Sequence, residues 1–148
     1  MLGHAFKEWA VICEALARGQ QSLLLRKGGI AETDDEFRVE QPRFWLYPTY
    51  VHQQNAGVQD DARPLLDHVN ANRPPAGKLH LQYWAEVGTV YRLHAELSAL
   101  LLSHLHIWSD ETVSSRFHYR EPGLYVLMVR VYRSPTVYEI DELPEYAG

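Results

Sequence analysis

Two basic residues and two glycines follow an apolar run in the stretch SLLLRKGGIAE. The leucines indicate a buried strand. This strand would bring Arg26, Lys27 and the backbone N–H groups of Gly28 and Gly29 to one end of a sheet. Two cations beside a flexible turn suit an anion such as phosphate, although a hairpin turn with solvated charges is the alternative. The spacing is not that of a Walker loop, in which a serine or threonine follows the lysine.

A second group of side chains with binding chemistry lies in RFWLYPTYVHQQ (residues 43–54). The group combines flat rings, a hydroxyl and an amide: Trp45, Tyr47, Thr49, Tyr50, His52 and Gln53. Rings of this kind can stack on a nucleobase while His52 or Gln53 bonds to its edge. Because the residue before a proline is extended, we expect residues 49–53 to leave the sheet as a loop at its rim. The alternative is that alternate rings face the core.

Catalytic signatures are missing from the sequence. It contains no HExxH, no paired-cysteine spacing and no Gly-x-Ser-x-Gly, so we predict neither a metal site nor a cofactor. If the protein is an enzyme acting on nucleotides or nucleic acid, the general acid–base candidates are Glu32, Glu40 and His52. The residues favour binding over catalysis.

The composition is that of one soluble globular domain over residues 1–148, with 46% hydrophobic residues and a net charge of −5. This charge argues against a surface that binds nucleic acid everywhere, but a local basic patch is compatible with it. Arginine outnumbers lysine, 11 to 3, and suits bidentate contacts to phosphate. Cys13 is the single cysteine, which is compatible with a reducing cytoplasm. No run approaches the ~18 apolar residues of a membrane span, so we predict a cytoplasmic protein with no membrane partner.

The elements that must position these residues follow from the hydrophobic spacing. Phe6, Trp9, Cys13 and Leu16 recur every three or four residues and predict a helix over 6–18, capped by Gly19. The alternative makes WAVICEAL a strand that forms a hairpin with SLLLR.

Further strands are predicted at 22–26, 36–40, 43–47, 79–87, 123–133 and 136–140, and helices at 64–71, 92–105 and after Ser109. We expect Leu24, Val126 and Met128 in the core. The predicted fold is an α+β domain with a small, curved, mostly antiparallel sheet and two or three packed helices.

Three stretches of the chain resemble a bacterial family known as domain of unknown function 1802. They are KEWAVICEALARGQQSLLLRKGGI, FRVEQPRFWLYPTYVHQQ and LYVLMVRVYR, and together they extend over nearly the whole chain. Some members of that family are associated with a restriction-endonuclease domain. The resemblance therefore implies a place in DNA restriction or defence, with a restriction endonuclease as a partner.

The segment GQQSLLLR is similar to the Gly-x-Lys-Thr-x-Glu-x-Arg motif of ASCH domains, which belong to the PUA-like superfamily. Gly19 and Arg26 match the motif and Ser22 is a conservative replacement, whereas Gln21 and Leu24 replace its lysine and its acid. The resemblance implies a partly open β-barrel that binds RNA or modified bases, and the two replacements favour binding over catalysis.

These features together predict a binding module for DNA, RNA or a nucleotide-like ligand, in single-stranded or modified-base form. The alternatives are an enzyme that processes nucleotides or nucleic acid and a protein-interaction subunit of a defence system. Phosphate binding weakens steeply with salt, which distinguishes the first class from an apolar protein interface.

Overall fold

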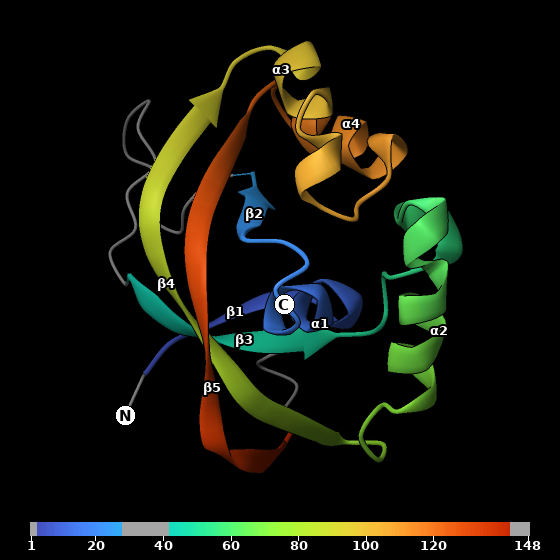
Figure 1. Cartoon of the computed structure of the whole chain (residues 1–148), viewed down its shortest axis with the longest axis vertical. Helices are drawn as coiled ribbons and strands as arrows, with labels where there is room; N and C mark the ends of the chain where they lie inside the picture. Colours follow the sequence, from blue (N-terminus) through green and yellow to red (C-terminus); the bar gives the residue numbers. More distant parts are fainter. Residues whose placement is uncertain (1–2, 28–41, 143–148) are drawn as a thin grey trace.

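The computed structural model describes residues 3–27 and 42–142. In this part of the chain, five strands form one mixed sheet in the order β1-β3-β4-β5-β2. The strands are β1 (Ala5–Trp9), β2 (Leu23–Arg26), β3 (Arg43–Thr49), β4 (Lys78–Leu93) and β5 (Leu124–Asp141). The α-helices are α1 (Ala10–Ala17), α2 (Arg63–Ala71), α3 (Glu96–Leu100) and α4 (Asp110–His118). Figure 1 shows a curved β4–β5 ribbon with all four helices on one side of it.

The predicted fold class is confirmed. The β1–β3 pairing is parallel, and the other three pairings in the described sheet are antiparallel. The predicted core residues Leu24 and Val126 are buried, and Met128 packs partly buried against the same core. The predicted strand at 36–40 lies outside the described residues.

The predicted helix over 6–18 is wrong in its first half. Residues 5–9 form β1, which pairs with β3, and the helix begins only at Ala10. Phe6 stacks on Phe44 of β3 with 4.1 Å between ring centroids, so a cross-strand contact replaces the expected helical one. The hairpin alternative is also wrong, because WAVICEAL is mainly helical. Gly19 does end the helix, with φ +73 and with the paired Schellman bonds from Gly19 and Gln20 to the carbonyls of Leu16 and Ala15.

Two further predictions need correction. The expected helix over 92–105 is reduced to the short α3, because β4 continues to Leu93. Leu97 and Leu101 are 66% and 65% exposed, so their helical spacing does not mark a buried face. The predicted strands at 123–133 and 136–140 are one strand, β5, whose pairing with β4 is interrupted between Arg133 and Tyr138.

Helices α2 and α4 begin as the sequence indicates. Pro64 stands in the first turn of α2, where its missing N–H is tolerated. Ser109 caps α4, and its hydroxyl accepts from the backbone N–H of Thr112 at 3.2 Å. This cap fixes the start of the helix that carries Arg116.

Candidate functional site

A cleft of ≈ 710 Å³ lies where β1, the ends of β2 and β3, the loop after α2 and one side of α4 meet. Its basic side chains are Lys7, Arg26, Lys27, Arg73, Lys78 and Arg116, and its carboxylates are Glu8 and Glu142. Its rings are Trp9, Tyr47, Tyr50, His52 and Tyr119. A protein of net charge −5 therefore has a cleft in which basic side chains outnumber acidic ones.

The structure brings together most of the residues that the sequence singled out. Arg26, Lys27, Tyr47, Thr49, Tyr50 and His52 line this one cleft. Trp45 and Gln53 do not line it. Gly28 and Gly29, and the acid–base candidates Glu32 and Glu40, lie outside the described residues.

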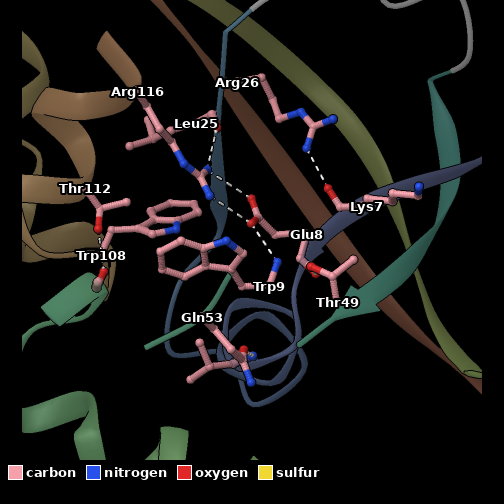
Figure 2. A network of polar contacts seen from close by, with 12 residues as sticks. Lys7, Glu8, Trp9, Leu25, Arg26, Thr49, Gln53, Trp108, Thr112 and Arg116 are labelled. Carbon is pink, nitrogen blue, oxygen red and sulfur yellow. Dashed lines mark hydrogen bonds and ion pairs between the residues drawn. The ribbon is translucent and has the colours of Figure 1, made fainter. Parts of the chain in front are cut away.

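Arg26 reaches across from β2 to β1. Its Nη1 donates to the backbone carbonyl of Lys7 at 2.8 Å (Figure 2), and its guanidinium lies 5.0 Å from the centroid of the Phe6 ring. Burial lowers the pKa of Arg26 below its ordinary value, while the nearby carboxylate of Glu8 opposes that shift. The carbonyl contact uses one of the five N–H donors of the guanidinium. The guanidinium of Arg26 is thus fixed in position at the wall of the cleft.

Lys27 has a structural role that the sequence does not reveal. Its ammonium donates to the carbonyls of Phe117 at 2.6 Å and Gly123 at 2.8 Å, and to the carbonyl of Glu121. These carbonyls belong to the last turn of α4 and the residues after it, where a cation is favoured by the helix dipole. The head of Lys27 is thus held by backbone carbonyls, and its part in binding a phosphate stays a prediction. Lys27 ties β2 to the end of α4.

Glu8 and Arg116 form an ion pair at the inner wall of the cleft. Two bonds of 3.3 and 3.2 Å join the guanidinium of Arg116 to the two carboxylate oxygens of Glu8, whose side chain is only 3% exposed. The guanidinium lies close to two indoles, 5.2 Å from the centroid of the Trp9 ring and 4.9 Å from that of the Trp108 ring (Figure 2). Arg116 also donates to the carbonyl of Leu25 at 3.1 Å. This cluster fixes α4 against β1 and β2.

Gln53 and Trp45, which were predicted to contact a ligand, serve the fold. The Oε1 of Gln53 accepts from the N–H of Val11 at 2.9 Å, in the first turn of α1, and its Nε2 donates to Asn70 of α2 at 2.8 Å. With both ends of its amide engaged, Gln53 joins two helices rather than facing the cleft. Trp45 meets Tyr138 edge to face at 5.7 Å.

The end of β3 and the loop after it carry the remaining predicted residues of the cleft. The hydroxyl of Thr49 donates to the backbone carbonyl of Glu8 at 3.2 Å and holds the end of β3 against β1. Tyr50 is partly buried, and this burial raises the pKa of its phenol. His52 is exposed. Tyr47 lies under the ammonium of Lys7, with 5.5 Å between Nζ and the ring centroid.

Sequence reasoning did not assign several residues of the cleft to a binding site, among them Lys7, Trp9 and Arg73. Arg73 carried a usable signal, because it stands in the breaker cluster NRPPAGK, where two prolines stiffen the backbone beside two cations. The approach of Arg116 to Glu8, 108 residues apart in sequence, has no local signal.

The described residues contain no group of three or more histidine, cysteine or acidic side chains placed to hold a metal ion. Among them, too, none of the helices combines the length and apolar character needed to cross a membrane.

Comparison with known proteins assigns this chain to a family. The family model described as "Domain of unknown function (DUF1802)" matches residues 5–148. No curated protein matches the sequence. Among solved structures, two variant forms of an ASCH protein from Zymomonas mobilis superpose with TM-scores of 0.52 and 0.50, each at 10% identity. The matches cover 93% and 85% of this chain, and 73% and 66% of theirs. At such low identity, the likeness shows the fold alone, which is similar to that of ASCH proteins.

Proposed function

The chain belongs to the DUF1802 family, and from its ASCH-like fold and its cationic cleft we propose that it binds single-stranded nucleic acid or a nucleotide. The observation that carries the proposal is the charge of the cleft. Six basic side chains and two carboxylates line it, although acidic residues outnumber basic ones in the whole chain, 19 to 14. A local concentration of positive charge on an acidic protein favours an anionic ligand over general adhesion to polyanions.

The basic residues of the cleft differ in how strongly they are already engaged. Lys27 and Arg116 hold carbonyls and the Glu8 carboxylate, and Lys78 pairs with Asp141 at 2.5 Å. Arg26 and Arg73 form no ion pair with any carboxylate of the described residues, and the ammonium of Lys7 lies over the Tyr47 ring, 5.5 Å from its centroid. Lys7, Arg26 and Arg73 are the phosphate-binding candidates of the proposal.

The fold supports the same ligand class. The PUA-like superfamily, which the GQQSLLLR segment resembles, commonly binds RNA or modified bases. The likeness to ASCH structures extends over 93% of this chain. The link to DNA restriction that the family resemblance implies stays a prediction, as does the restriction-endonuclease partner.

Fluorescence anisotropy with labelled single-stranded RNA and DNA of about ten nucleotides tests the proposal. We expect Lys7→Gln and Arg73→Gln each to weaken binding about tenfold, since a charge-assisted hydrogen bond typically contributes ~1.5–3 kcal/mol. Arg63→Gln is the matched control, because Arg63 is an exposed arginine outside the cleft, paired with Asp60 at 3.1 Å. Equal losses in the control and in the cleft variants would contradict the proposal. Conversion of the oligonucleotide during the assay would instead indicate the enzyme alternative.

A further inference from the structure

Arg73 is carried by a stiff turn at the rim of the cleft. Pro74 and Pro75 follow it, and each proline ring fixes its own φ and restricts the residue before it to extended backbone. Gly77 takes φ +79, a conformation that favours glycine, and the N–H of Lys78 closes the turn by donating to the carbonyl of Pro75 at 3.0 Å. The backbone that presents Arg73 is therefore held in place before any ligand arrives.

The side chain of Arg73 lies against an aromatic ring. Its guanidinium is 4.7 Å from the centroid of the Tyr50 ring, which stands in the loop after β3 on the same cleft. Arg73 is exposed, and it has no hydrogen bond or ion pair with any of the described residues. A tyrosine phenol is neutral at physiological pH, and burial raises the pKa of Tyr50 further. The pair thus combines a neutral ring with an exposed planar cation.

We propose that Arg73 and Tyr50 form a stacking platform for one unpaired nucleobase. The inference rests on the proposed function and narrows it: the ligand is a strand that presents an unpaired base, and neither a bare phosphate nor a duplex. A guanidinium is planar and weakly hydrated, so it stacks on an aromatic ring and offers a flat surface to a base. A phosphate requires only the cation for binding, whereas a stacked base uses both the guanidinium and the aromatic ring beneath it.

The platform lies beside cations that can hold the backbone of the same strand. Lys7 and Arg26 line the cleft with Arg73 and Tyr50. Lys7 itself lies over the ring of Tyr47, with its Nζ 5.5 Å from the centroid. A base on the platform would bring its flanking phosphates toward these two cations, and the charge of Arg73 would add to their attraction. Bases inside a duplex are already stacked and cannot reach the platform without unpairing.

The test compares probes that differ only in their bases. Wild-type protein is titrated with a labelled single-stranded ten-mer, with the same backbone made of abasic residues, and with the corresponding duplex. Stacking should make the base-containing strand bind roughly five- to a hundredfold more tightly than the abasic strand. Arg73→Lys keeps the positive charge but removes the planar guanidinium. It should therefore reduce this ratio toward one, while the affinity for the abasic strand stays within about twofold of the wild-type value. Tyr50→Leu should have the same effect, and Arg63→Lys, the control, should leave the ratio unchanged.

The outcomes separate the two levels of inference. If the wild type binds the abasic and base-containing strands equally, or if Arg73→Lys leaves the ratio intact, the platform is refuted while phosphate binding by the cleft stands. Duplex binding as tight as single-strand binding would also refute the platform. If none of the three probes binds, the proposed function fails together with the platform. Circular dichroism of each variant, unchanged from wild type, shows that a loss of the ratio is not a loss of the fold.

Discussion

Replacing Glu8 by glutamine should destabilise the protein more than any surface substitution, because it leaves Arg116 without its counter-charge. Glutamine keeps the shape of the side chain and one carbonyl oxygen for the N–H of Trp9, which now donates to Glu8 at 2.8 Å. It loses the charge that makes both bonds to Arg116.

The magnitude follows from burial. Removing one partner of a fully buried pair costs about 3–5 kcal/mol. Glu8 meets this condition at 3% exposure, but the Arg116 side chain is 24% exposed and keeps its contacts with Leu25 and the two indoles. Solvent and these contacts offset part of the loss, so we expect about 2–3 kcal/mol for Glu8→Gln.

Urea denaturation followed by tryptophan fluorescence measures this effect. With an m-value of about 2 kcal/mol per molar, the midpoint should fall by about 1–1.5 M. Arg116→Met together with Glu8→Gln should cost less than the sum of the two single changes, since the double variant buries no unpaired charge. A Glu8→Gln midpoint within 0.2 M of wild type, or strictly additive costs, would refute the claim that this ion pair organises the inner wall of the cleft.

Three further predictions follow from single contacts. Gly57→Ala should cost ~1–3 kcal/mol in thermal or urea unfolding, because a Cβ at Gly57 would lie 2.7 Å from the Trp9 ring; an unchanged stability would mean that the ring moves freely. Lys27→Met should cost ~1–3 kcal/mol, since it leaves the carbonyls at the end of α4 without their donor, and a variant as stable as wild type would disprove this role. Burial lowers the pKa of His106 to about 4, below the ~6.5 of the unfolded chain, so the unfolded state binds the proton first as the pH falls. The contribution of His106 to the free energy of unfolding should therefore be lost as the pH falls from about 6.5 to about 4. Urea titrations of wild type and His106→Gln across this range should show a smaller fall in the free energy of unfolding for the variant.

The sequence predicted those parts of the fold that depend on local signals. Gly19 and Ser109 are capping residues whose effect needs only their near neighbours, and both end or begin a helix where expected. Phe6 and Trp9 were assigned to a helix because their spacing continues into Cys13. Pairing with β3 overrides this spacing, and such a tertiary contact cannot be inferred from periodicity.

In the candidate site, too, local signals were predictable and distant contacts were not. The sequence singled out Arg26 and Tyr47 as candidates for ligand binding, and the structure brings both into one cleft. It could not predict that Lys27 is engaged by carbonyls about 90 residues away, or that Gln53 joins two helices. A polar side chain looks equally suited to a ligand and to a distant backbone group until the fold brings that group near.

The salt dependence of oligonucleotide binding tests the central claim most directly. If Lys7, Arg26 and Arg73 neutralise about three phosphates of a single strand, log K should fall with log salt with a slope of about −2. The affinity of the wild type for a single-stranded ten-mer should then drop roughly twentyfold between 50 and 200 mM salt, and Arg73→Gln should reduce the slope by about 0.7. An affinity that stays constant over this range, or a slope that Arg73→Gln leaves unchanged, would contradict the account of the cleft as a phosphate-binding site.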